Sequence, residues 1–111
     1  MKSDVDVLQG TLDLLVLHIL SAGPQHGWGV AQALKARSQE RLVVTQGSLY
    51  PALHRLEKEG WIAAEWGVSE NNRRAKYYRL SRSGRQQLAR ATERWRRYTA
   101  GVDLVLSSVT P

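Results

Sequence analysis

The stretch that decides the fold reads QGSLYPALHRLEKEGWIAAEWGVSENNRRAKYYRL, from Gln46 to Leu80. In its first part Leu49, Leu53 and Leu56 recur at spacings of four and three, which predicts a helix with one apolar side. Gly60 is expected to end this helix, because a residue without Cβ readily takes the left-handed conformation that closes a last turn. The outer side of the predicted helix carries Ser48, Tyr50, Pro51, His54, Arg55 and Lys58.

A short basic β-hairpin is predicted directly after this helix. Residues 61–66 and 75–80 have the composition of two strands. Their connection ends in Asn71-Asn72-Arg73-Arg74, which places turn-forming amides beside two guanidinium groups. A surface helix with polar side chains, followed by a hairpin with a basic tip, is typical of a winged helix-turn-helix that grips duplex DNA.

The start of the third helix has two interpretations. With Ser48 as the N-cap, Pro51 falls in the first turn, where its missing N–H has no cost. A start at Thr45 requires a distortion near Gly47. We favour a tight first turn at Ser48, which also directs Tyr50 outward.

Two further helices are predicted ahead of this stretch. After a loose terminus at residues 1–7, the first runs from Leu8 to Leu20 and is apolar on two sides. A helix in a small monomer needs only one apolar face, so the second stripe predicts another covering surface, such as a partner subunit. The second helix runs from His26 or Gly27 to Ser38, with Trp28 expected in the core. The stripes of the first helix are Leu8, Leu12, Leu15 and Ile19, and Leu14 and Leu17.

Ser81 is predicted to cap a last, long helix. Its apolar residues advance by alternating steps of three and four, which is the pattern of a coiled-coil seam. No other part of so short a domain is left to bury this seam. Residues 81–111 are therefore predicted to form a dimerisation helix, which packs on its symmetry mate and on the first helix. The predicted interface comprises Leu8, Leu12, Leu15, Leu88, Ala91, Trp95, Tyr98, Val102, Val105 and Val109.

The composition limits the classes of function. One chain of 111 residues with 42% hydrophobic content makes a single domain, and the lack of cysteine removes disulfides and thiolate metal sites. With no membrane-length apolar segment and no signal peptide at the N-terminus, a cytoplasmic location is expected. The net charge is +6. Residues 1–44 have no net charge, residues 45–80 carry +2 and residues 81–111 carry +4. This excess suits a polyanionic partner, and it suits a solvated cationic face equally well.

Several spaced motifs closely resemble the PadR family of bacterial transcriptional regulators, from about Gln9 to the end of the chain. The resemblance implies a mainly α fold with a small β-hairpin: a winged helix-turn-helix in residues 1–80 and one dimerisation helix in residues 81–111. It also implies a homodimeric regulator, expected to be a repressor, on a pseudo-palindromic operator in double-stranded DNA. The motifs are Gly10-Thr11-Leu12-Asp13-Leu14-Leu15, His26-Gly27-Trp28-Gly29, Gly47-Ser48-Leu49-Tyr50-Pro51-Ala52-Leu53, Leu56-Glu57, Gly60-Trp61-Ile62, Lys76-Tyr77-Tyr78 and Leu80-Ser81.

The candidate DNA contacts lie on the third helix and the hairpin. Hydroxyls and guanidiniums fix the register on phosphates, and groups that reach the groove floor specify bases. Two alternatives stay open: Tyr50 as a core or interface aromatic, and the hairpin arginines as plain solvated cations. Glu57 and Glu59 are expected to pair within the protein, because phosphate repels a carboxylate. The predicted contacts are Gln46, Ser48, Tyr50, His54, Arg55, Arg73, Arg74 and Lys76.

An effector site is the second hypothesis. Two symmetry-related Trp95 indoles at a dimer axis can wall a slot for a small planar aromatic ligand. Some multidrug-sensing PadR relatives use a tryptophan of the C-terminal helix in this way, and the resemblance implies that role for Trp95. Trp95 as ordinary interface packing remains the alternative. Trp61 and Trp66 are expected to brace the hairpin on the core. The further candidate walls are Leu8, Leu12, Leu15 and Tyr98.

Catalysis finds no support in the sequence. His18, His26 and His54 fall on three predicted helices without metal-like spacing, and Ser48 lacks the neighbouring base of a nucleophile motif. No glycine-rich phosphate loop occurs. We therefore predict no enzyme activity, no cofactor and no metal. The rival functions are a winged-helix protein-interaction module without DNA binding, and RNA binding, which the lack of an exposed stacking platform disfavours.

Overall fold

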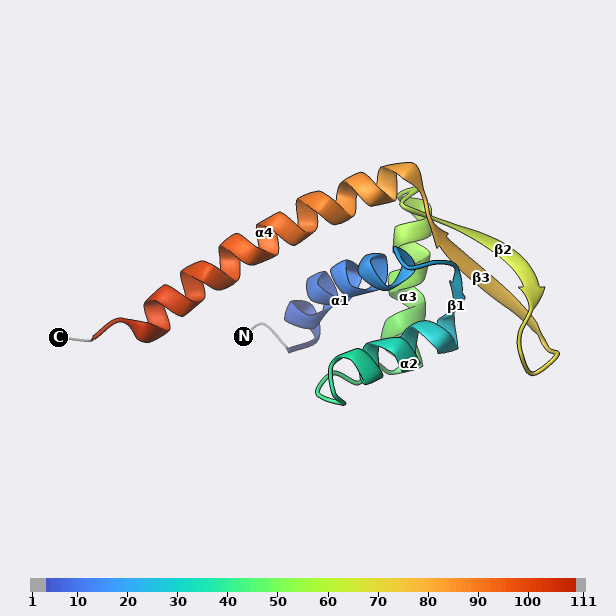
Figure 1. Cartoon of the computed structure of the whole chain (residues 1–111), viewed down its shortest axis with the longest axis horizontal. Coiled ribbons are helices and arrows are strands. Elements are labelled where there is room, and N and C mark those ends of the chain that lie inside the picture. Colours follow the sequence, from blue (N-terminus) through green and yellow to red (C-terminus); the bar gives the residue numbers. More distant parts are fainter. Residues whose placement is uncertain (1–3, 110–111) are drawn as a thin grey trace.

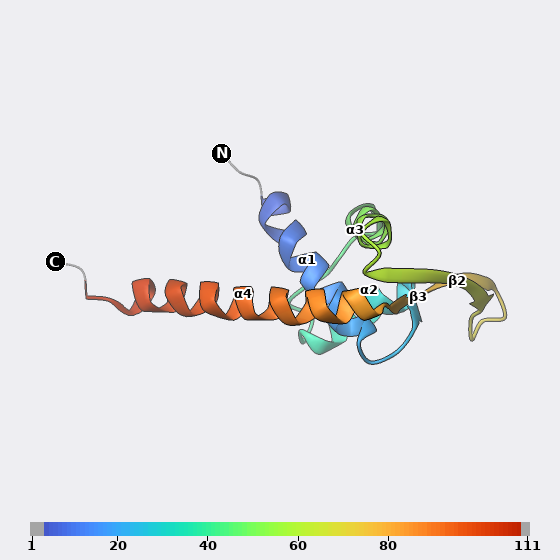
Figure 2. The same ribbon diagram turned by 90° about the horizontal axis from the view of Figure 1, so that it is seen from above.

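The computed structural model describes residues 4–109, with side chains described from residue 10 onward. Three helices pack together, a small sheet lies at one side, and a long last helix runs away from that sheet (Figure 1). The view from above shows the last helix projecting well past the bundle (Figure 2). This is the predicted mainly α fold with a small β element. The elements are α1 (Asp4–Leu20), β1 (Gln25–His26), α2 (Gly27–Arg37), α3 (Gln46–Lys58), β2 (Ile62–Val68), β3 (Arg74–Leu80) and α4 (Arg82–Ser107).

The core forms where α1, α2 and α3 meet the inner end of the sheet. Leu49, Leu53 and Leu56 are at most 1% exposed, which confirms the apolar side predicted for α3. Each such leucine contributes about 2 kcal/mol through burial. Their neighbours in the core are Val16, Leu17, Leu20, Val30, Leu34, Ile62 and Leu80.

The predicted start of α3 at Ser48 is wrong. Thr45 is the N-cap, and its side-chain hydroxyl accepts a hydrogen bond from the backbone N–H of Ser48. Pro51 therefore lies inside the helix, where its missing N–H leaves only the carbonyl of Gly47 without its helical partner. Gly47 is exposed, so water can satisfy that carbonyl, and α3 continues through the proline.

The sheet has three antiparallel strands in the order β1-β3-β2. β2 and β3 form the predicted hairpin, here called the wing, in a register that pairs Ile62 with Leu80 and Val68 with Arg74. Asn72 closes its tip with φ 59°, a left-handed conformation that asparagine tolerates. β1 was not predicted: Gln25 pairs with Tyr78 and His26 with Tyr77, which attaches the start of α2 to the wing.

The structure corrects two further expectations in the N-terminal half, the loose terminus and the place of Trp28. Residues 4–7 belong to α1, so the predicted loose terminus is wrong there, and residues 1–3 lie outside the described part. The side chain of Leu8 also lies outside it. Leu12 is 7% exposed and already belongs to the protomer core. Trp28 is 57% exposed, so its expected place in the core is wrong.

The predicted cap of α4 is confirmed. The backbone N–H of Gly84 donates to the hydroxyl of Ser81, which in turn donates to the carbonyl of Gly60. Gly84 is buried against the carbonyl of Trp61, and the first half of α4 packs on α1. The helix ends at Ser107 with Ser108 as its C-cap, so the expectation that Val109 continues the helical seam is wrong.

Candidate nucleic-acid interface

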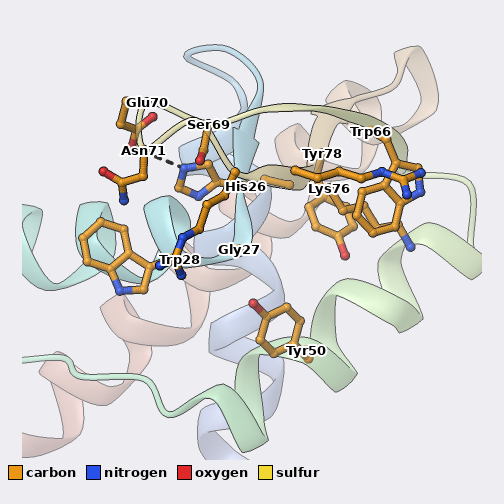
Figure 3. A pocket seen from close by; sticks show the side chains of 13 residues that line it. His26, Gly27, Trp28, Tyr50, Trp66, Ser69, Glu70, Asn71, Lys76 and Tyr78 are labelled. Carbon is orange, nitrogen blue, oxygen red and sulfur yellow. Dashed lines mark ion pairs between the residues drawn. The ribbon is translucent and has the colours of Figure 1, made fainter.

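A hollow of about 490 Å³ lies between the start of α2, the outer side of α3 and the wing (Figure 3). Trp28 and Tyr50 border it on the helical side, whereas Trp66 and Lys76 border it on the wing side. The tertiary fold thus brings one predicted residue of α3 together with predicted residues of the wing. The predicted DNA contacts that line the hollow are Tyr50, Arg73, Arg74 and Lys76.

Tyr50 stands at the surface and packs over Gly27. Its side chain is 45% exposed, so it is not a core aromatic in the protomer. A Cβ at Gly27 would lie 3.0 Å from Cε1 and 3.1 Å from the hydroxyl oxygen of Tyr50. Glycine at position 27 therefore lets the Tyr50 ring lie this close to the first turn of α2, and a larger residue would push the ring outward.

The wing carries its cations on aromatic rings. The guanidinium of Arg74 lies 4.4 Å from the ring centroid of Trp66, a cation–π contact within the wing. Trp66 is 57% exposed, so it supports Arg74 at the surface and does not brace the wing on the core as expected. Trp61, in contrast, packs against the core as predicted.

Acidic partners separate the wing cations into two groups. Lys76 Nζ lies 3.4 Å from Glu57 Oε1, which confirms the pairing predicted for Glu57. The pairing predicted for Glu59 is wrong within the described residues 10–109, where Glu59 is exposed and forms no ion pair. Neither Arg73 nor Arg74 forms an ion pair within the described residues 10–109. Both arginines are exposed, so their charge is available to an external anion.

Arg55 differs from the other predicted contacts on α3. Its Nη2 donates to Asp13 Oδ1 of α1 over 2.6 Å, and its side chain is only 37% exposed. The DNA contact predicted for Arg55 stays a prediction, and it competes with this intramolecular ion pair. Gln46, Ser48 and His54 are exposed on the outer side of α3 but do not line the hollow.

His26 was missed by the sequence analysis as a structural residue. It is 8% exposed, and its Nδ1 accepts a hydrogen bond from the backbone N–H of Gly29, which caps α2. Its Nε2 lies 3.5 Å from Glu70 Oε1 in the wing loop. A backbone hydrogen bond and the neighbouring His26 lower the pKa of the Glu70 carboxyl. The signal in the sequence was the polar residue three positions before Gly29, which is N-cap spacing.

The residues predicted to bind an effector lie in two separate places. Leu12 and Leu15 line a second cavity of about 540 Å³, bounded by α1, α2 and the start of α3. Trp95 and Tyr98 do not line this cavity; their ring centroids lie 6.1 Å apart on α4. Within one protomer, neither of the two cavities described is lined by both Trp95 and Leu15.

The fold and the hollow define a winged-helix regulator: three packed helices, a two-stranded wing and a basic recess between them. Residues 16–90 match the transcriptional regulator PadR-like family, and the chain belongs to this family. Members of the family are transcriptional regulators. No helix in the described residues has both the length and the apolar character that a bilayer crossing requires.

Individual relatives support the same assignment. The chain is 36% identical over 75 residues to transcriptional regulator Rv3488 of Mycobacterium tuberculosis, covering 68% of this chain and 66% of that protein. A transcriptional regulator from Clostridium thermocellum is similar with a TM-score of 0.80 at 28% identity, covering 88% of this chain and 95% of that one. A PadR-like transcriptional regulator from Bacillus cereus gives a TM-score of 0.79 at 27% identity, covering 94% and 99%.

Proposed function

We propose that this protein binds double-stranded DNA as a homodimer and represses transcription from a pseudo-palindromic operator. The observation that carries the proposal is the hollow between α3 and the wing, where Tyr50, Arg73 and Arg74 face solvent together. The two arginines lack acidic partners within residues 10–109, as expected for side chains that neutralise phosphate. A DNA partner implies a cytoplasmic location.

The dimer is supported by the apolar seam on α4. Trp95 is 40% exposed, Tyr98 66% and Val105 72%, although the pattern of the sequence is that of a buried stripe. A contiguous exposed apolar stripe of this kind marks a protein interface. A second copy packed along α4 would bury it and hold two α3 helices at half-sites about 34 Å apart, one turn of duplex.

A small planar effector at the dimer axis is part of the same proposal. Trp95 and Tyr98 already form a tilted aromatic pair on the exposed seam. Two such pairs related by symmetry would wall a slot for a flat aromatic molecule. Filling it would change the separation of the two α3 helices and release the operator.

The proposal is tested by DNA binding at several salt concentrations. We expect duplexes from upstream of the gene itself to bind, with an affinity that falls steeply as salt rises. The pair Arg73→Ala/Arg74→Ala should weaken binding and reduce the slope of log affinity against log salt by about 2, because about 0.9 counterion is released per phosphate contact. This double variant should remain a dimer in a mass measurement.

The matched control is the pair Arg96→Ala/Arg97→Ala. These adjacent arginines are also exposed, but they lie on α4, away from the wing. The one ion pair they lose, between Arg97 and Glu93, is a surface pair of little energetic weight. If the control weakens binding as much as the wing pair, the assigned surface is wrong. If a stable dimer ignores every upstream duplex, the protein-interaction module is the better reading.

A further inference from the structure

Trp28 is a large aromatic side chain that its own protomer leaves uncovered. It lies on the first turn of α2, and 57% of its surface is exposed. Among the described residues its aromatic neighbour is His26, whose ring centroid lies 6.5 Å away in a tilted arrangement. A side chain of this size contributes most when buried, so its exposure at this position requires an explanation.

Contacts of the two preceding residues fix the position of Trp28. The residue two places before it, His26, caps α2 through Gly29 and pairs with Tyr77 in the sheet. The next residue along, Gly27, lies under the ring of Tyr50. Trp28 is thereby held at the border of the hollow, across from the wing (Figure 3).

The groups around the hollow are mostly hydrogen-bond donors. Trp28 and Tyr50 line it from α2 and α3, and Arg73, Arg74 and Lys76 line it from the wing. Among the lining residues Glu70 is the single acidic one; it contacts His26 Nε2 and lies toward the Trp28 end of the hollow, away from Tyr50 (Figure 3). Such a set of donors suits an anion with several oxygen atoms.

The indole adds a feature that a cation lacks. Its ring presents a flat apolar face, and its single N–H donates from one edge. In a DNA strand each apolar deoxyribose is joined directly to a phosphate. An indole can therefore pack its face on the sugar while its N–H bonds to the neighbouring phosphate oxygen.

We propose that the hollow receives the sugar–phosphate backbone of one DNA strand and that Trp28 contacts it. The first turn of α2 is then a third DNA-contacting element, beside α3 and the wing. This inference rests on the proposed DNA-binding function and deepens it. A backbone contact carries no sequence information, so Trp28 contributes to affinity for any duplex.

The test compares Trp28→Ala and Trp28→Phe with the wild type, on an operator duplex and on an unrelated duplex, over a range of salt. Trp28→Ala should weaken binding to both duplexes by the same factor, roughly tenfold, the equivalent of 1.4 kcal/mol. The salt slope should not change, because the indole is neutral and releases no counterion. Trp28→Phe keeps the ring without the N–H and should recover part of the loss.

The matched control is Gln32→Ala, one turn further along the same side of α2, exposed and outside the hollow. It should bind both duplexes as the wild type does. Unfolding midpoints of all three variants show whether the fold is retained. Trp28→Phe serves as the informative variant if Trp28→Ala unfolds.

The failures are distinguishable. If the Trp28 variants bind DNA with wild-type affinity while Arg73→Ala/Arg74→Ala still weakens binding, the Trp28 contact is wrong. The proposed DNA-binding function then still holds. A loss confined to the operator shows base readout and overturns the backbone contact. A reduced salt slope together with a lowered unfolding midpoint shows that Trp28 acts by positioning the wing, which also overturns it. If Arg73→Ala/Arg74→Ala also binds DNA with wild-type affinity, the proposed function itself is wrong.

Discussion

The guanidinium of Arg55 lies 2.6 Å from the carboxylate of Asp13, which joins α3 to α1 between residues 42 positions apart. Burial raises the pKa of the Asp13 carboxyl above its usual 3.8, and Arg55 offsets part of that rise. The ion pair thus compensates incompletely for the desolvation of the acid. Removing one partner should therefore have a different effect from removing the other.

We predict that Arg55→Ala lowers the free energy of unfolding by about 1 kcal/mol, because a half-buried carboxylate loses its partner. Asp13→Asn should cost less, since it removes the desolvated charge itself. Urea unfolding of both variants and of the double variant measures the coupling. Equal costs for the two single changes would contradict the incomplete compensation.

The same pair makes stability depend on pH. The folded pKa of Asp13 lies above the unfolded one, so protonation favours the folded state. This contribution is fully present below the unfolded value and is lost as the pH rises through the folded value. The wild type should therefore gain stability relative to Asp13→Asn between neutral pH and about pH 4, as unfolding midpoints at each pH would show.

Gly27→Ala should weaken DNA binding with little effect on folding. The new methyl group would lie 3.0–3.2 Å from three atoms of the Tyr50 side chain. Tyr50 is 45% exposed and can move outward, which relieves the clash but shifts its ring and hydroxyl from their places at the hollow. Binding isotherms with the upstream duplex should show the loss while the thermal midpoint stays close to that of the wild type. A lowered midpoint with unchanged affinity would place the effect in the fold.

Gly84→Ala should strongly destabilise the protein. Its methyl group would overlap the backbone carbonyl of Trp61, which cannot move as a flexible side chain can. Overpacking of this kind lowers the free energy of unfolding by about 1–3 kcal/mol. In a domain of this size each kcal/mol lowers Tm by about 4–8 °C. Gly101→Ala on the same helix meets nothing within 4 Å and should instead gain up to about 1 kcal/mol. Calorimetry of the two variants tests the contrast.

Trp95→Ala should weaken the dimer and abolish the quenching of indole fluorescence by planar dyes. The indole is 40% exposed in the protomer, and the proposed slot uses it as a wall. Sedimentation measures the first effect and fluorescence titration the second. Quenching that survives the substitution would exclude the slot, while an unchanged dissociation constant would exclude Trp95 from the interface.

Local patterns in the sequence were sufficient to predict the four helices and the cap of α4, but not every helix end. The spacing of Leu49, Leu53 and Leu56 predicted the buried side of α3, because all three lie within four turns of one element. Ser81 was identified as the cap of α4 from its position alone, since its partner Gly84 is three residues away. The start of α3 was predicted at Ser48 instead of Thr45 because a proline is expected only in the first turn of a helix. Pro51 is tolerated further inside because the carbonyl of Gly47, which it leaves without a helical partner, can reach water.

Contacts between distant elements could not be predicted in this way. β1 has two residues and no periodicity, and it exists because His26 meets Tyr77 in the folded chain. Hydropathy placed Trp28 in the core, but the cap at His26 directs the first turn of α2 so that the indole faces solvent. Helix periodicity directed Arg55 outward without revealing that Asp13 lies within its reach.

The amino-acid sequence by itself determined the family, the order of the helices and the wing, and which side of each long helix is apolar. These follow from the spacing of side chains along single elements, which repeat every 3.6 or two residues. Only the tertiary structure decided that Tyr50, Trp28 and the wing arginines border one hollow, and that Arg55 is held by α1. Such groupings depend on how separate elements pack, and spacing along one chain segment holds no information about that packing.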